Sequence, residues 1–122
     1  MDTVQEKTAA QKAVPDRTAD QVVVIELEGE LDSRSAPAVQ QRVVRQLEHG
    51  GRLLLDVTAL TYVSSAGLRT LLLAYRRAVA AGGRVALTGV STELAEIMQA
   101  TGFLHFFDCF ETVADGLSAL AA

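Results

Sequence analysis

The chain has 122 residues, of which 49% are hydrophobic and only 5% aromatic, and its net charge is −4. This length predicts one domain with an aliphatic core, and the acidic balance without a basic stripe argues against nucleic acid as a partner. No apolar run approaches the roughly 20 residues that cross a bilayer, so we expect no membrane partner. A single cysteine, Cys109, excludes an internal disulfide framework and is typical of the reducing cytoplasm.

The first 20 residues are polar and show little periodicity. Such a composition predicts a flexible N-terminal lead-in over residues 1–20. A short edge strand near residues 9–14 is the alternative for part of this segment. We therefore place the folded domain at residues 21–122.

A strand followed by a helix is predicted at the start of this domain. The run "VVVIELEGEL", residues 22–31, opens with β-branched residues and then alternates apolar and polar ones, as a strand does. Gly29 interrupts the alternation and suggests a bulge or a close backbone approach. The run "SAPAVQQRVVRQLEHG", residues 35–50, has helical periodicity, with Ser35 as its cap and Pro37 in its first turn.

Three further strand–helix pairs follow this first one. The predicted strands are "RLLLDV" (52–57), "RVALTGV" (84–90) and "HFFDCF" (105–110). One helix begins at Ser64 and Ser65 and stops before Gly82 and Gly83, and two more follow at 91–101, with Ser91 as cap, and at 111–122. Alternation of this kind predicts an α/β fold with a mostly parallel sheet of four to five strands, packed with about four helices. We expect Cys109, in the last strand, to be a packed core thiol.

The helix that begins near residue 65 carries one apolar stripe and one mixed face. Five apolar residues at helical spacing form the predicted core stripe: Leu68, Leu71, Leu72, Tyr75 and Val79. Leu73 falls on the other face, bordered by Arg69 and Arg76. A leucine between arginines is a candidate contact for another protein, although an isolated exposed leucine is an equally good explanation.

Two adjacent hydroxyls, Ser64 and Ser65, stand where this helix begins. The N–H groups of a first turn lack partners and the helix dipole is positive there, so a serine hydroxyl at this point is an ordinary cap. The same position also suits an anion. A phosphoryl group on a serine here would place about −1.5 to −2 charges at a helix end that favours negative charge. Position alone permits either role.

Four segments in this order and spacing resemble the STAS domain of bacterial anti-sigma factor antagonists. They are "GELD" (29–32), "LLLDVTALTYVSSAGLRTLL" (53–72), "GGRVALTGVS" (82–91) and "TGFLHFFDCFET" (101–112). The resemblance covers residues 20–120 and implies a single-domain STAS-like fold. It also implies a switch: the unphosphorylated protein binds an anti-sigma factor that is also a serine-protein kinase, and the sigma factor is released. Phosphorylation ends this binding, and a serine phosphatase of the metal-dependent class restores it.

The family motif Asp-Ser-Ser-Gly-Leu, anchored on Gly67 and Leu68, implies Ser65 as the phosphorylated residue. Ser64 stands where the family has aspartate. It therefore offers a second hydroxyl and is the second candidate for phosphorylation. Asp32 matches the acidic residue near the modified serine, and a turn or cap after the strand explains it equally well. The implied partner-binding surface comprises Asp32, Ser64, Ser65, Ala66, Arg69, Leu73 and Arg76.

An enzyme is not expected, and neither is a metal or other cofactor. Ser65, His105 and Asp32 could be combined on paper into a catalytic triad, but no nucleophile-elbow sequence supports it. The main alternative function is another STAS role, as an unphosphorylated accessory subunit of a lipid-transport ATPase or of a stress-signalling complex.

Overall fold

The computed structural model of the protein describes residues 22–48 and 51–121. The predicted lead-in at 1–20 and the alternative strand near 9–14 lie outside the described residues. Within the described part, a sheet of four parallel strands has the order β1-β2-β3-β4. The elements are β1 (Val22–Leu31), α3 (Ala36–Leu47), β2 (Arg52–Val63), α4 (Ser65–Ala80), β3 (Arg84–Thr88), α5 (Thr92–Ala100), the 3₁₀ helix η1 (Phe103–Phe106), β4 (Asp108–Phe110) and α6 (Val113–Ala121). The predicted α/β fold with a parallel sheet and four α-helices is confirmed.

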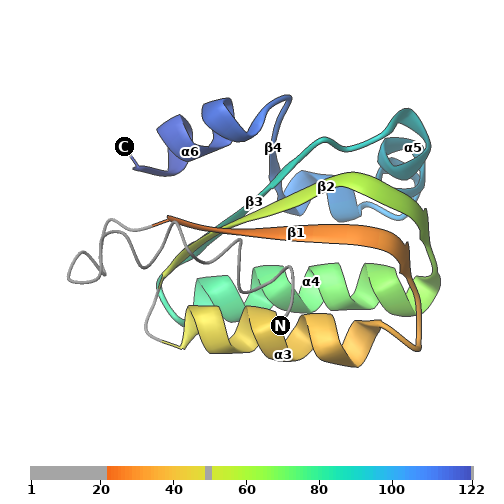
Figure 1. Ribbon diagram of the computed structural model, residues 1–122, viewed down its shortest axis with the longest axis horizontal. Helices are drawn as coiled ribbons and strands as arrows, with labels where there is room; N and C mark the ends of the chain where they lie inside the picture. Colours follow the sequence, from red (N-terminus) through yellow and green to blue (C-terminus); the bar gives the residue numbers. More distant parts are fainter. Residues whose placement is uncertain (1–21, 49–50, 122) are drawn as a thin grey trace.

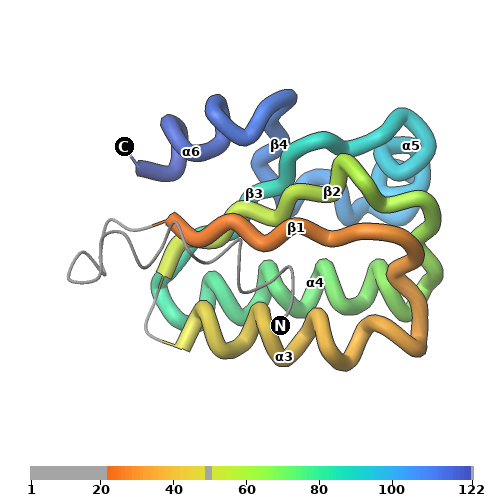
Figure 2. The backbone as a smooth tube through the Cα atoms, viewed as in Figure 1, coloured from red at the N-terminus to blue at the C-terminus, as the bar shows by residue number. Residues whose placement is uncertain are grey.

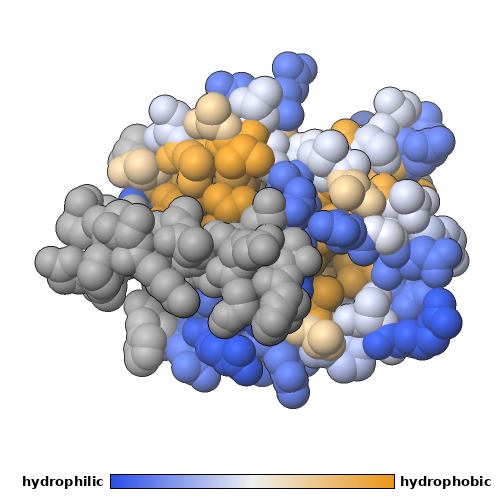
Figure 3. Space-filling model, viewed as in Figure 1, coloured by the Kyte–Doolittle hydropathy of each residue, from blue (hydrophilic) through white to orange (hydrophobic). Residues whose placement is uncertain are grey.

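The helices cover the two faces of the sheet unequally. Figure 1 and the backbone trace in Figure 2 place α3 and α4 side by side along one face, whereas α6 lies on the opposite face. The larger cluster of buried side chains joins β1, β2 and β3 to α3, α4 and α5. The smaller cluster, Leu54, Ala86 and Leu120, lies under α6, where Figure 3 shows hydrophobic side chains gathered between α6 and the strands. The face with α3 and α4 therefore carries most of the apolar burial that stabilises the fold.

The strands β1 and β2 are irregular near their carboxyl ends. Gly29 has a φ of 73°, and the register of the pair shifts between Glu26 and Glu28 and again between Gly29 and Glu30. The predicted bulge at Gly29 is thus confirmed. The strand β2 runs to Val63, six residues beyond the predicted end, because its last part remains paired with β1 up to Leu31.

The helix α4 buries a different face from the one predicted. Leu68 and Leu71 are buried as expected, but Val79 is 59% exposed and Leu72 is only half-buried. Instead, Ala74 and Ala78 complete the buried face. Because these small residues are buried, the buried face of α4 is rotated relative to the predicted stripe. Leu72 and Val79 therefore lie at its border.

The last predicted strand is mostly a different structure. His105 and Phe106 belong to η1, and only Asp108–Phe110 forms the strand β4. Phe106 and Phe107 pack instead on Tyr75 of α4, with ring centroids 5.0 and 5.9 Å away. Cys109 is exposed rather than a core thiol, because β4 is an edge strand and its next residue, Phe110, points to the opposite face and packs on the smaller cluster.

Candidate functional site

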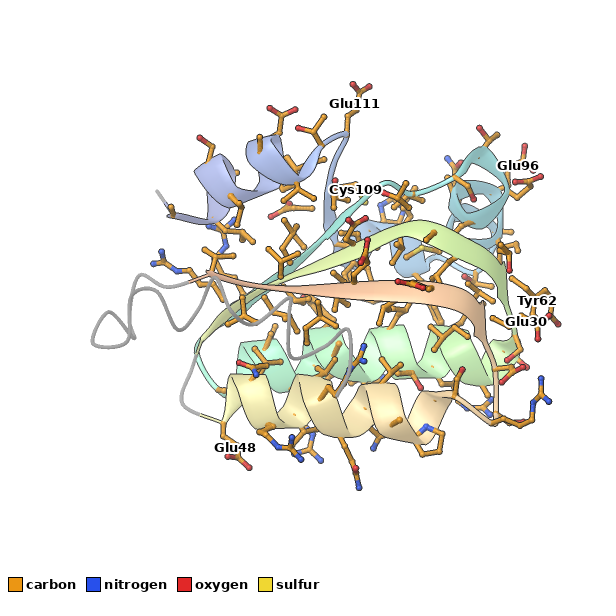
Figure 4. The ribbon with its side chains drawn as sticks, viewed as in Figure 1. Glu30, Glu48, Tyr62, Glu96, Cys109 and Glu111 are labelled. Carbon is orange, nitrogen blue, oxygen red and sulfur yellow. The ribbon has the colours of Figure 1, made fainter. Side chains whose placement is uncertain are left out.

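The carboxyl ends of β1 and β2 bring the predicted site residues to one edge of the sheet. Leu31 pairs with Val63 in the register of the two strands, and the Ser64 N–H donates to the Leu31 carbonyl oxygen at 2.9 Å. Asp32 and Ser64 therefore follow directly after neighbouring strand ends. Figure 4 shows Glu30 and Tyr62 at this same edge, and the Tyr62 side chain is 56% exposed.

Ser64 and Ser65 have different positions at the start of α4. Ser64 is the N-cap, with extended backbone at φ −85° and ψ 177°, and its Oγ accepts from the Gly67 N–H at 3.2 Å. Ser65 is the first helical residue and is exposed. Its Oγ makes no hydrogen bond with any residue that the structure describes. One hydroxyl is therefore used by the fold, while the other faces solvent at the positive end of the helix.

Gly67 is buried where α4 begins. A methyl group at this position would overlap the Leu31 carbonyl oxygen and also press on the side chains of Leu31 and Val63. The glycine therefore leaves no open space beside the two serines. It lets the first turn of α4 lie directly on the end of β1, which fixes where Ser65 is presented.

Asp32 organises the turn between β1 and α3. Its Oδ1 accepts from the backbone N–H groups of Arg34 at 3.0 Å and of Ser35 at 3.2 Å. These hydrogen bonds, with that to Arg34 first, hold the pKa of the Asp32 carboxyl below its usual value. Ser35 occupies the predicted N-cap position of α3 but makes no capping hydrogen bond. Its Oγ instead donates to the Glu30 carbonyl oxygen at 2.8 Å and accepts from the Asp32 N–H at 3.0 Å. The turn role of Asp32 thus has direct structural support.

A groove between α3 and α4 begins beside the two serines. Its volume is about 590 Å³, and four residues of the predicted partner surface line it: Ala66, Arg69, Leu73 and Arg76. Leu73 is half-buried in this groove rather than isolated on a helix surface. The opposite wall, with Ser33, Pro37 and Gln40, was not predicted from the sequence. Its only sequence signal is the polar outer face of the α3 helix.

The electrostatics of this region are positive. No acidic residue lies in the first turn of α4. Arg69 and Arg76 are exposed, and neither forms an ion pair with any described residue. Within the described residues, the helix end and these two arginines offer a positive surface on the α4 side of Ser65, with the Asp32 carboxylate on the β1 side.

The other candidates from the sequence do not gather at this site. His105 lies on η1 and makes no hydrogen bond to Ser65 or Asp32 within residues 22–48 and 51–121. No group of three or more potential metal-binding side chains occurs among the described residues. None of the described helices is long and apolar enough to span a membrane.

Comparison with known proteins agrees with this geometry. BtrV of Bordetella bronchiseptica, whose name assigns it provisionally to the anti-sigma factor antagonists, is 31% identical over 104 residues, covering 84% of this chain and 86% of BtrV. An anti-sigma factor antagonist from Mycobacterium paratuberculosis is 27% identical with a TM-score of 0.69, and the match covers 83% of this chain and 86% of that one. The phosphorylated form of SpoIIAA from Bacillus has a TM-score of 0.66 at 21% identity, over 83% of this chain and 92% of that one. A sequence model of the STAS domain matches residues 13–116, and the chain therefore belongs to the STAS domain family.

Proposed function

We propose that this protein is an anti-sigma factor antagonist, a binding protein rather than an enzyme, that is switched by phosphorylation of Ser65. Unmodified, it binds an anti-sigma factor that is also a serine-protein kinase, and it thereby releases a sigma factor. The names of BtrV and of the mycobacterial relative support the general role. A cytoplasmic location belongs to the same proposal, because its partners act on transcription.

The observation that carries this proposal is the exposed hydroxyl of Ser65 at the first position of α4. A kinase needs a serine oxygen that is reachable and not already held by the fold, and Ser65 meets both conditions. Ser64 meets them less well, since it is half-buried and its Oγ caps the helix. This difference favours Ser65 over Ser64 as the phosphorylated residue. SpoIIAA, which shares this fold, exists in a phosphorylated form.

The same surface accounts for the switch in energetic terms. An unmodified serine can be covered by a partner at little cost. A phosphoserine dianion must be stripped of water when the partner covers it, which costs several kcal/mol unless the partner supplies cations. A penalty of about 3 kcal/mol lowers affinity more than a hundredfold. The helix itself tolerates the dianion well, since negative charge at its first turn is favourable, so no rearrangement of this protein is required.

The proposed partner surface consists of the start of α4 with the adjacent turn, here called the tip, and the adjoining groove. Asp32, Ser64 and Ser65 supply the tip, with Asp32 holding the turn next to the serines. Ala66, Arg69, Leu73 and Arg76 supply the wall of the groove on α4. In this proposal a metal-dependent serine phosphatase removes the phosphate, for which the exposed position of Ser65 leaves access.

Co-purification from the native host tests this function. Tagged wild-type, Ser65→Ala and Ser65→Asp chains are recovered, and bound proteins and phosphorylated residues are identified by mass spectrometry. We expect a serine-protein kinase with Ser65→Ala and with the wild type, little of it with Ser65→Asp, and phosphate on wild-type Ser65. Recovery of an ATPase subunit instead, with phosphate on neither Ser64 nor Ser65, would support the accessory-subunit alternative and contradict the proposal.

A further inference from the structure

The groove beside Ser65 is the first part of a longer depression along the seam of α3 and α4. A second hollow, of about 500 Å³, shares Pro37 and Gln40 with the first. A third, of about 280 Å³, shares Val44 and Arg77 with the second. We call these three adjoining hollows the seam groove. Because α3, the shorter of the two helices, has 12 residues and a helix rises about 1.5 Å per residue, both helices flank the seam groove for roughly 18 Å.

Each of the three hollows has apolar side chains in its lining, together with polar ones such as Gln40 and Gln41. Pro37 and Leu73 line the first hollow, Val44 lines the second and third, and Ala80 lines the third. These residues are on the outer sides of α3 and α4, since the inner sides are buried against the sheet. Figure 1 shows that the two helices run along each other beneath the sheet, with their shared outer side facing away from it. Such a lining matches the apolar stripe of an added helix.

The charges along the seam groove are almost all positive. Its lining contains four exposed arginines, Arg45, Arg69, Arg76 and Arg77, and one acidic residue, Glu48. Figure 4 places Glu48 at the far end of α3. None of the four arginines has an ion pair among the described residues, although the whole chain has a net charge of −4.

Helix stability explains only part of this pattern. Arg45 and Arg77 lie in the last turns of α3 and α4, where a positive charge is favourable. Arg69 and Arg76 lie earlier in α4 and have no such reason. A positive rim around an apolar floor is instead the arrangement that complements a partner with carboxylates around an apolar stripe.

We propose that the seam groove binds an amphipathic helix of a protein partner, with small apolar residues on its inner face and carboxylates on both flanks. The inference deepens the proposed function, on which it rests for the identity of the partner. A second copy of this chain is a poorer occupant, because its own seam groove would bring arginines against arginines. Nucleic acid is also a poorer fit, since the lining has no aromatic side chain for stacking.

An acidic partner helix in the seam groove also explains how a phosphoryl charge on Ser65 would weaken partner binding. The carboxylates that pair with the arginines of the seam groove would meet a phosphoryl dianion where the groove begins. The modification then adds like-charge repulsion to the loss of hydration, which is an efficient way to reject a partner.

The test uses the full chain, labelled with nitrogen-15, and two synthetic helical peptides of 16 residues. One peptide has leucine and alanine on one face and glutamate on both flanks, and the other has lysine in place of glutamate. We expect the acidic peptide to shift the amide signals of Gln40, Val44 and Leu73, and to bind about tenfold or more tightly than the basic one.

A pair of matched variants identifies the contribution of the far end of the seam groove. The double variant Arg45→Gln/Arg77→Gln should weaken binding of the acidic peptide about fivefold. The double variant Gln99→Glu/Ser118→Glu changes the net charge equally, but on α5 and α6, and should bind as the wild type does. Circular dichroism checks that both variants are folded.

Several results would overturn this proposal. They are equal affinity for the two peptides, no binding of the acidic peptide, signal shifts on another face, or equal weakening by both double variants. Concentration-dependent shifts of the free chain at the seam groove would assign it to a second copy instead. If Arg45→Gln/Arg77→Gln binds the kinase like the wild type while Ser65→Asp does not, the seam groove proposal fails and the proposed function stands.

Discussion

The helices α4 and α5 begin in the same way but differ in charge. Each follows a parallel strand and has a serine N-cap in extended conformation, Ser64 for α4 and Ser91 for α5. In each case the serine Oγ accepts an N–H from three residues further on, at 3.2 Å for α4 and 3.0 Å for α5. However, α5 has Glu93 in its first turn, whereas the first turn of α4 has no acidic residue.

In the proposed switch, this difference separates a structural cap from a regulatory position. At α5 the fold supplies both the cap and the negative charge that the helix dipole favours. At α4 the cap is present, but the charge is missing and an exposed hydroxyl stands at the first helical position. A helix start that lacks its own charge is well placed to receive one by phosphorylation.

The largest expected effect comes from adding a charge at the equivalent position of each helix. Ser65→Asp should lower the affinity for the anti-sigma factor kinase by about a hundredfold, because the partner must cover an unpaired carboxylate. Thr92→Asp places the same charge at the first position of α5 and should leave the affinity unchanged. Isothermal titration calorimetry with the kinase measures both. Similar losses for the two variants would remove the distinction between the helix starts.

The next effect concerns packing at the start of α4. Gly67→Ala should lower the free energy of unfolding by about 1–3 kcal/mol, because the added methyl overlaps the Leu31 carbonyl oxygen. Helix propensity alone predicts the opposite sign, a gain of up to about 1 kcal/mol. Urea unfolding therefore decides between packing and propensity. A stabilised variant would show that the first turn of α4 is not held against β1.

Removing each cap hydroxyl should have similar, smaller effects. Ser64→Ala and Ser91→Ala should each cost about 1 kcal/mol of unfolding free energy, since each removes one hydrogen bond to a first-turn N–H.

Phosphorylation of the chain by the kinase should persist in Ser64→Ala and disappear in Ser65→Ala, as measured by mass spectrometry. Loss of phosphate in Ser64→Ala alone would reverse the two assigned roles.

The smallest effect concerns the turn before α3, where the Asp32 carboxylate accepts the N–H groups of Arg34 and Ser35. Asp32 holds the turn before α3, and its pKa is lower in the folded chain than the usual value of about 3.9. Its charge therefore adds stability above about pH 4, and this contribution is lost as the pH falls through the lower folded pKa. Asp32→Asn should be less stable than the wild type at about pH 6, and the gap should narrow near pH 2. A gap that is constant with pH would contradict this role.

Much of the fold followed from local sequence patterns. Local signals predicted strand β1, the bulge at Gly29 and the helix cap Ser91: these signals are apolar–polar alternation, a glycine and a capping serine. The alternation of strands and helices along the chain predicted that the sheet is parallel. The carboxyl end of β2 could not be predicted. Residues 58–63 pair with β1 through two register shifts, so their apolar and polar residues do not alternate regularly.

The errors share a cause, which is tertiary packing. Alanines at 74 and 78 carry little hydrophobic signal, yet they form the buried face of α4, and the prediction placed Val79 there instead. His105 and Phe106 have strand-like neighbours, but stacking of Phe106 on Tyr75 favours a 3₁₀ turn. Cys109 is exposed because β4 is an edge strand in which Phe110, not Cys109, packs on the core.

The site was predictable in its α4 half alone. The two serines and the arginine-bordered Leu73 lie on one continuous stretch, so helical spacing relates them directly. The opposite wall of the groove comes from α3, and only the fold brings it there. Which of the two serines is free also depended on the structure, since a single hydrogen bond to Gly67 distinguishes Ser64 from Ser65.

The central claim is that a partner accepts the bare start of α4 and rejects it once Ser65 carries a phosphoryl group. The most direct measurement compares the affinity of the anti-sigma factor kinase for the unmodified chain and for a chain with phosphoserine incorporated only at position 65. We expect binding to weaken more than about a hundredfold, while the melting temperature of the modified chain stays equal or rises. Equal affinities for the two forms would contradict the account.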